Sequence, residues 1–185
     1  RNLATGRLDA VPFVSGGCRR QPMMRRILKL LVIGGFGAYV AVLALLYVKQ
    51  GDLLYPRNPA RIDIAAVDLP GVEETELTTS DGERLIAWVV PPREGKPVLL
   101  YFHGNAGNLG RGRRPIQLAS LTEDGTGLSA VSYRGYGGST GMPSEEGLLF
   151  DARAAYAAAA ARFGAERLIG YGESLGTGVI LKLAA

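Results

Sequence analysis

A long uncharged stretch near the start of the chain stands out in the pattern of hydrophobic and polar residues. The 19 residues from Leu30 to Val48 carry no charge, and a helix needs about 20 such residues to cross the ~30 Å hydrocarbon core of a membrane. Glycines within this run are tolerated in a transmembrane helix. The pattern therefore predicts a transmembrane anchor helix over residues 27–48, preceded by a disordered basic segment over residues 1–26.

The stretch has two other interpretations. A secretory signal peptide has a shorter apolar core of ~7–15 residues and a small-residue cleavage site, which the segment Leu45–Lys49 does not offer. A buried core helix would need neighbouring apolar segments to surround it. Basic residues are concentrated before the run, at Arg19, Arg20, Arg25, Arg26 and Lys29. The positive-inside rule then predicts a cytoplasmic N-terminus, with the bulk of the chain across the membrane.

Beyond the anchor the pattern changes twice. Residues 49–71 contain three prolines and no clear period, which predicts a linker or an irregular lead-in. Residues 72–185 then begin with two alternating runs around the turn signal Ser80-Asp-Gly82, which is typical of an antiparallel hairpin. Apolar runs alternating with helical patterns follow. The predicted strands are 98–102, 128–133 and 167–171, and the predicted helices are 115–121, 144–163 and 177–183.

Strands that alternate with helices indicate an α/β fold with a mostly parallel sheet and right-handed crossovers. Ser144 before an acidic turn predicts the start of the long helix, and Gly164 predicts its end. The 185 residues have room for one domain and an appendage. The sequence thus predicts a transmembrane helix, an antiparallel hairpin and part of an α/β domain.

Composition excludes several classes of function. The formal net charge is +4, but the second basic cluster, Arg111, Arg113 and Arg114, lacks the interleaved aromatics of a nucleic-acid surface and is interpreted as solvated charge. The single cysteine, Cys18, allows no intramolecular disulfide. The single histidine, His103, makes a His/Cys metal site untenable. No nucleic-acid partner and no metal are expected, and nothing in the pattern indicates an oligomeric state.

The candidate chemistry lies in the stretch Leu168–Gly178, where an apolar strand leads into a helical pattern. Between them lies Gly172-Glu-Ser-Leu-Gly176, which has the G-x-S-x-G form of a nucleophile elbow. A serine on so tight a turn is held in a strained conformation, and only small residues two positions either side let the backbones pack closely. Ser174 is the candidate nucleophile, and the two glycines are candidate site-shaping residues.

A second motif, His103-Gly-Asn-Ala-Gly-Asn108, directly follows a continuous apolar strand. Glycines such as Gly104 let the backbone turn so that an N–H group points into a site, which is how an oxyanion loop is built. A dinucleotide-binding turn is the rival interpretation of the glycines at 170–178. Their spacing is not G-x-G-x-x-G, and no acidic residue follows about 20 positions on.

Three segments together resemble a known family. Residues 97–108 (PVLLYFHGNAGN), 131–142 (VSYRGYGGSTGM) and 167–178 (RLIGYGESLGTG) are similar to the membrane-anchored, serine aminopeptidase-like branch of the α/β-hydrolase superfamily. The resemblance covers roughly residues 72–185. It implies acyl transfer to a serine and hydrolysis of the acyl-enzyme by water, with a small-molecule acyl substrate and no cofactor.

The resemblance also assigns roles to individual residues. It implies Ser174 as the nucleophile, with the backbone N–H groups of Leu175 and of Asn105 or its neighbour as oxyanion donors. His103 and Gly104 would shape the site, and the loop Tyr133–Gly138 would form part of its wall. The substrate class is not implied: carboxylic esters are the default, and a membrane anchor makes lipid-like esters plausible.

The sequence departs from the superfamily in its triad, which runs serine, then acid, then histidine along the chain. No Asp, Glu or His follows Ser174, and His103 lies ahead of it in the oxyanion motif, where a packing role is expected. We therefore expect a longer parent chain to supply the acid and the histidine, and residues 1–185 alone to be inactive and poorly stable. The alternatives are a non-catalytic membrane-tethered scaffold and a structural membrane protein in which the motif is a coincidence.

Overall fold

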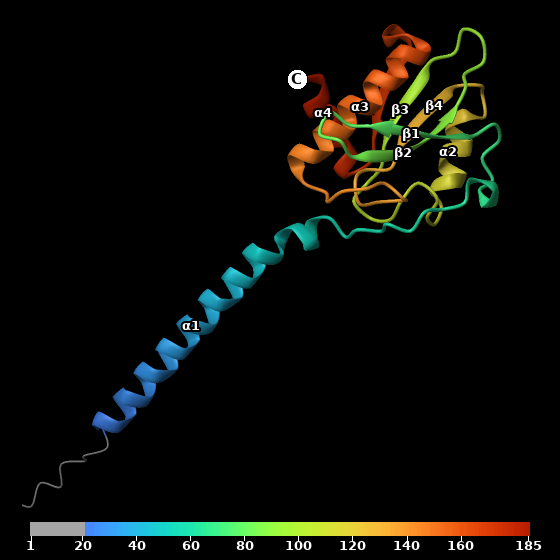
Figure 1. Ribbon diagram of the computed structural model, residues 1–185. Helices are drawn as coiled ribbons and strands as arrows, with labels where there is room; N and C mark the ends of the chain where they lie inside the picture. Colours follow the sequence, from blue (N-terminus) through green and yellow to red (C-terminus); the bar gives the residue numbers. More distant parts are fainter. Residues whose placement is uncertain (1–20) are drawn as a thin grey trace, which may run out of the picture. The chain divides into compact units, whose positions relative to one another are not determined.

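The computed structural model describes residues 21–185, so the predictions for residues 1–20, including Cys18, lie outside the described residues. The chain divides into two compact units, Arg1–Val48 and Lys49–Ala185. The elements, in order, are α1 (Gln21–Leu54), η1 (Ile64–Ala66), β1 (Glu73–Thr78), β2 (Arg84–Val90), β3 (Val98–Phe102), α2 (Arg114–Thr122), β4 (Gly127–Val131), α3 (Glu145–Phe163), η2 (Ala165–Arg167), β5 (Leu168–Gly172) and α4 (Leu175–Ala184) (Figure 1).

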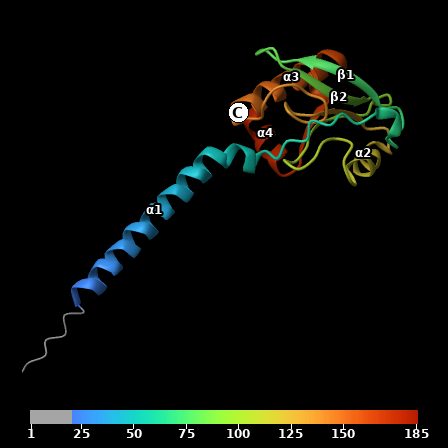
Figure 2. The ribbon, with the colours of Figure 1, turned by 60° about the horizontal axis from the view of Figure 1, so that its bottom comes forward.

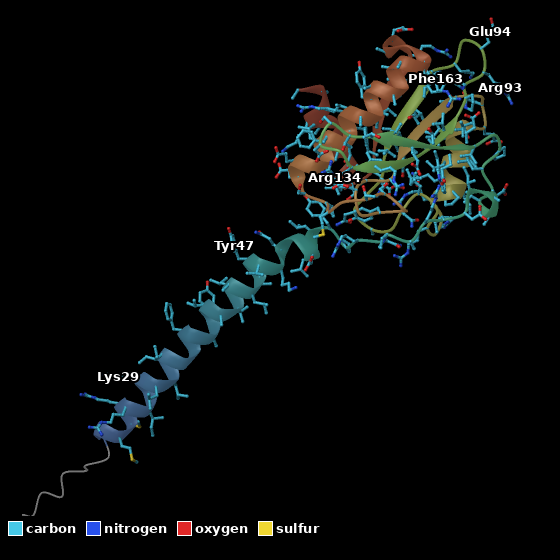
Figure 3. All side chains as sticks on the ribbon, in the orientation of Figure 1. Lys29, Tyr47, Arg93, Glu94, Arg134 and Phe163 are labelled. Carbon is cyan, nitrogen blue, oxygen red and sulfur yellow. The ribbon has the colours of Figure 1, made fainter. Side chains whose placement is uncertain are left out.

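The helix α1 is longer than predicted at both ends. Its segment Met23–Leu54 is long and apolar enough to cross a membrane, with a mean hydropathy of 2.3 over its most apolar window and no part of that window buried. Side chains such as Lys29 and Tyr47 project outward along it (Figure 3). Residues 21–26, expected to be disordered, are helical, in agreement with the high helix propensity of methionine and arginine.

The sheet has five strands in the order β1-β2-β4-β3-β5. The hairpin strands β1 and β2 pair antiparallel, and β2 joins the rest through an antiparallel pairing with β4. Strand β3 lies parallel to β4 on one side and parallel to β5 on the other. The predicted α/β architecture with a leading hairpin is confirmed, and the sheet is mixed, with its parallel part made of β4, β3 and β5.

Helices cover both faces of the sheet, as Figures 1 and 2 show, with α3 and α4 on one face and α2 on the other. Because side chains alternate along a strand, β2 contributes Leu85 and Ala87 to one core and Ile86 and Trp88 to the other. Strands buried on both faces read as continuous apolar runs. This explains why β3 could be located in the sequence with its bounds unchanged.

The lead-in after α1 is part of the domain rather than a free linker. Its Asn58 forms a parallel bridge with Tyr136 in the loop after β4, and its Leu69 is buried in the core on the α2 face. The backbone N–H groups of Gly137 and Gly138 donate to carbonyls of this lead-in, at 2.8 and 3.0 Å. The prolines explain its irregular backbone, but its apolar residues still bind it to the domain.

Candidate active site

Ser174 occupies the turn between β5 and α4 in a strained conformation. Its φ and ψ are 50° and −110°, and it is the one residue other than glycine with a positive φ between positions 21 and 185. Such a conformation costs of order 1–3 kcal/mol and persists only where the surroundings enforce it. The strained serine that the G-x-S-x-G pattern predicts is therefore present at this turn.

The two glycines of the elbow are required by close backbone contacts. A Cβ atom on Gly172 would lie 2.5 Å from the carbonyl group of Gly176, and one on Gly176 would overlap the carbonyl oxygen of Phe102. The N–H of Glu173 donates to that same Phe102 oxygen at 3.0 Å. The elbow is thus held directly against the end of β3, where the loop with the predicted oxyanion motif begins.

The first turn of α4 presents a free donor beside the serine. The N–H groups of Gly176 and Thr177 donate to the carbonyls of Glu173 and Ser174, at 2.9 and 3.0 Å. Among the described residues, the N–H of Leu175 has no hydrogen bond. Because it opens a helix, it also lies at the positive end of the helix dipole, which favours a developing negative charge.

The loop after β3 approaches Ser174 closely. A Cβ atom on Gly104 would lie 3.5 Å from the Cβ of Ser174, so the loop passes at van der Waals distance from the candidate nucleophile. The next residue, Asn105, uses its side-chain amide to donate to the carbonyl of Leu54, at 3.1 Å. Farther along, the buried Asn108 donates to the carbonyl of Ala60, at 2.9 Å. The loop is therefore tied on one side to the lead-in and lies against the elbow on the other.

His103 is fully buried and has both ring nitrogens occupied. Nδ1 donates to the carbonyl of Gly104 at 2.6 Å, and Nε2 accepts from the N–H of Tyr133 at 3.4 Å. Burial lowers the pKa of the imidazole from 6.5 to about 4, so the ring is neutral at physiological pH. These contacts join the loop after β3 to the loop after β4, the structural role that the sequence favoured over that of a general base.

Arg114 corrects one interpretation made from the sequence. The cluster 111–114 was interpreted as solvated charge, but the Arg114 side chain is 10% exposed and donates from Nη1 to the carbonyl of Asn108 at 2.6 Å. Its Nε lies 3.6 Å from a carboxylate oxygen of Glu173, which also accepts from the hydroxyl of Tyr101 at 2.6 Å. No sequence signal identified this trio, because its members lie on three separate elements.

An ion-pair network around the buried Arg134 holds the loop Tyr133–Gly138 in place. Arg134 donates from Nε to Asp151 at 2.8 Å, and from both terminal nitrogens to Asp81 in the hairpin turn, at 2.7 and 3.0 Å. Burial raises the pKa of the Asp151 carboxyl to about 6, whereas the Arg134 hydrogen bonds lower the pKa of Asp81. Figure 3 shows Arg134 at the end of the domain where this loop lies. The network ties this loop to α3 and to the hairpin turn.

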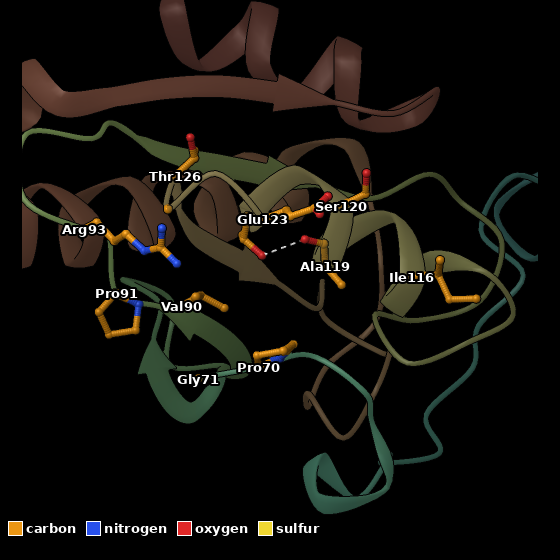
Figure 4. Close-up of a pocket in the computed structure, with 12 residues that line it drawn as sticks. Pro70, Gly71, Val90, Pro91, Arg93, Ile116, Ala119, Ser120, Glu123 and Thr126 are labelled. Carbon is orange, nitrogen blue, oxygen red and sulfur yellow. Dashed lines mark hydrogen bonds between the residues drawn. The ribbon is translucent and has the colours of Figure 1, made fainter.

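A cavity of about 700 Å³ lies away from these residues (Figure 4). It is lined in part by Val90 at the end of β2 and by Thr126 just before β4 begins. This is the edge where the parallel strands start, whereas ligands of α/β sheets bind at the carboxyl ends of those strands. Within residues 21–185, no cluster of His, Cys, Asp or Glu suited to a metal ion is present.

Comparisons with known proteins agree with this fold. No family model matches the chain. The α/β hydrolase domain-containing protein WAV2 of Arabidopsis thaliana is 33% identical over 80% of this chain and 51% of the relative. Lysophosphatidylserine lipase ABHD12 of Danio rerio is 32% identical over 90% of this chain and 50% of the relative.

The chain belongs to the α/β-hydrolase superfamily. An esterase of this superfamily fold, Pf2001 of Pyrococcus furiosus, superimposes with a TM-score of 0.57 at 18% identity, over 69% of this chain and 51% of that one. Such a likeness shows the fold alone. The chain spans about half the length of the curated relatives it matches.

Proposed function

We propose that this chain provides the nucleophile and the oxyanion site of a membrane-anchored serine hydrolase acting on carboxylic esters or related acyl compounds. The observation that supports this proposal most strongly is the positive φ of Ser174, on a turn that Gly104 of the proposed oxyanion loop approaches at van der Waals distance. The relative named a lysophosphatidylserine lipase supports hydrolase activity in general.

In the proposed reaction, the Ser174 Oγ attacks the acyl carbon and gives its proton to a general base. The base then passes that proton to the departing alcohol, leaving an acyl-enzyme that water hydrolyses to the free acid and serine. The N–H groups of Leu175 and Asn105 would stabilise the oxyanion, a contribution worth about 10²–10³ in rate for a single donor.

The general base is proposed to come from residues of the complete protein beyond Ala185, as the superfamily's order of serine, acid and histidine implies. His103 is unsuited to the role because its ring is buried and both nitrogens are engaged. In this proposal residues 27–48 hold the domain at a membrane, with the N-terminus cytoplasmic and the domain on the opposite side.

The test is covalent labelling of the full-length protein with a fluorophosphonate probe, read by in-gel fluorescence. The wild type is expected to be labelled, and Ser174→Ala to lose the signal. Ser120→Ala, which changes an exposed serine on α2, is the matched control and is expected to label normally. Labelling that survives Ser174→Ala, or a folded wild-type protein that never reacts, would favour the non-catalytic scaffold instead.

A further inference from the structure

A second cavity, of about 430 Å³, lies beside the elbow. Glu173, the neighbour of the candidate nucleophile, forms one side, and the oxyanion loop and the start of α2 form the rest. The lining residues are Ala106, Arg111, Arg113, Arg114, Gln117 and Glu173. Three of these six are arginines, so the lining of this cavity is more basic than that of the cavity at the opposite edge of the sheet.

The positive charge of this cavity is only partly neutralised. The hydrogen bond from Tyr101 lowers the pKa of Glu173, so that this carboxylate is charged, and Arg114 is the arginine close to it. Within the described chain, neither Arg111 nor Arg113 forms an ion pair or a side-chain hydrogen bond. The lining therefore keeps a formal excess of positive charge beside the serine.

Arg114 adds a second observation that points to a ligand. Its side chain is nine-tenths buried, and its Nε is a buried donor without a hydrogen-bond partner. Leaving such a donor unpaired costs roughly 1–3 kcal/mol, and more for a charged group. The helix α2, which begins at this residue, also has no side-chain cap, and the positive end of its dipole lies here.

Arg111 is positioned by the oxyanion loop itself. A Cβ atom on Gly107, whose φ is +80°, would lie 2.8 Å from the Cδ of Arg111, so this side chain crosses the loop at a point where only glycine fits. The backbone of Arg111 also donates to the carbonyl of Asn108, at 3.3 Å. The arginines and the donors near Ser174 thus belong to one loop and helix start.

We propose that this cavity binds the anionic group, a carboxylate or a phosphate, of an acyl substrate whose ester carbonyl lies at Ser174. The proposal rests on the proposed function and names the class of substrate. Planar guanidinium groups suit both a carboxylate and a phosphate, because a guanidinium can donate two parallel hydrogen bonds to either group. Specificity follows from charge: a neutral substrate would leave Arg111 and Arg113 without partners.

The experiment measures kcat/KM of the full-length protein in neutral detergent for matched pairs of esters. One pair carries the charge on the acyl side, mono(4-nitrophenyl) glutarate against 4-nitrophenyl pentanoate. The other carries it on the alcohol side, 2-phosphoethyl pentanoate against butyl pentanoate, with release of pentanoate measured. In at least one pair, Arg111→Gln/Arg113→Gln is expected to lower the anionic-to-neutral ratio about tenfold or more.

A control separates this effect from bulk charge. Arg93→Gln/Arg153→Gln removes the same charge from exposed positions elsewhere and is expected to leave the ratio unchanged. An unchanged ratio in Arg111→Gln/Arg113→Gln, while Ser174 still reacts with the fluorophosphonate, would overturn this inference alone. Loss of labelling in the wild type would instead overturn the proposed function. An arginine effect that appears only when anionic lipid is added would assign the cluster to the membrane surface and also overturn the inference.

Discussion

The loops that follow β4 and β3 leave the same edge of the sheet but are held in different ways. In the loop after β4, residues 132–137 are buried, and the charged side chain of Arg134 and the hydroxyl of Ser139 find partners within the protein, while the buried hydroxyls of Tyr133 and Tyr136 have none among the described residues. In the loop after β3, Ala106 and residues 111–113 are exposed, and Arg114 keeps an unpaired donor. The charged group of the first loop is paired inside the protein, whereas the second loop keeps charged donors of the kind that bind anionic ligands.

The two buried arginines show this difference most clearly. Arg134 is matched by two carboxylates, whereas Arg114 bonds to backbone carbonyls and lies 3.6 Å from Glu173, outside hydrogen-bond distance. A fully paired buried charge stabilises one arrangement and is costly to disrupt. A partly paired charge has donors left for another molecule. We therefore expect mutations at Arg134 to act on stability and those at Arg114 to act on activity.

The largest effect is expected from Arg134→Met, which leaves the fully buried Asp151 without its partner. Breaking a buried pair on one side costs about 3–5 kcal/mol. The free energy of unfolding of the full-length protein would be measured in urea through the emission of the buried Trp88. Arg84→Met, which removes an exposed ion pair to Glu76, is the control and is expected to cost less than about 1 kcal/mol. Equal losses in both variants would contradict the scaffold role of Arg134.

The next effect is a loss of stability in acid, caused by His103. Its folded pKa of about 4 lies below the ordinary 6.5, so its contribution is fully present above pH 6.5 and is lost as the pH falls towards 4. A depression of this size corresponds to roughly 3 kcal/mol. Unfolding free energies measured from pH 7 to pH 4 should converge for wild type and His103→Gln. Subtracting the free energy of unfolding of His103→Gln from that of the wild type at each pH removes the contribution of Asp151. The raised pKa of Asp151 makes stability depend on pH in the opposite direction. Parallel curves would rule out a neutral, buried imidazole.

A smaller effect is expected from Arg114→Met, which removes the brace on the Asn108 carbonyl. Arg114 is here a positioning residue, so kcat for a neutral ester is expected to fall about tenfold while KM changes little, since misplacing a catalytic loop raises the barrier rather than weakening binding. Arg114→Lys keeps a charged donor and is expected to restore part of kcat. A loss confined to the free energy of unfolding would place Arg114 with the scaffold, and the contrast between the loops would fail.

The smallest effect is expected from Ser144→Ala at the start of α3, the helix that carries Asp151. The Ser144 hydroxyl accepts from the N–H of Gly147 at 3.0 Å, and loss of such a cap costs about 1 kcal/mol. The urea midpoints of unfolding of Ser144→Ala and Arg134→Met are compared. Their difference shows how much more the stability of this region depends on the buried charge than on the helix cap. A cap variant as damaging as the arginine variant would remove that distinction.

The features that could be predicted from the sequence depend on residues close to one another along the chain. The bounds of β3, the cap at Ser144 and the Gly164 at the end of α3 follow from apolar runs and capping chemistry within a few residues. The strained turn at Ser174 follows from a five-residue pattern. By contrast, Asp81 lies 53 residues from Arg134, and no propensity or period connects them. The same holds for contacts between elements such as Arg114 with Glu173.

Carbonyl groups of residues 54–60 accept hydrogen bonds from the loops after β3 and β4. These hydrogen bonds determine where a truncated domain without the apolar helix should begin. A version that begins at Val72, where the regular pattern starts, would lose the acceptors used by Gly137 and Asn108. A version that begins at Gly51 keeps them, together with the Leu54 carbonyl bound by Asn105. The practical boundary therefore lies ahead of Leu54, because a shorter version would leave the loop after β3 without these contacts.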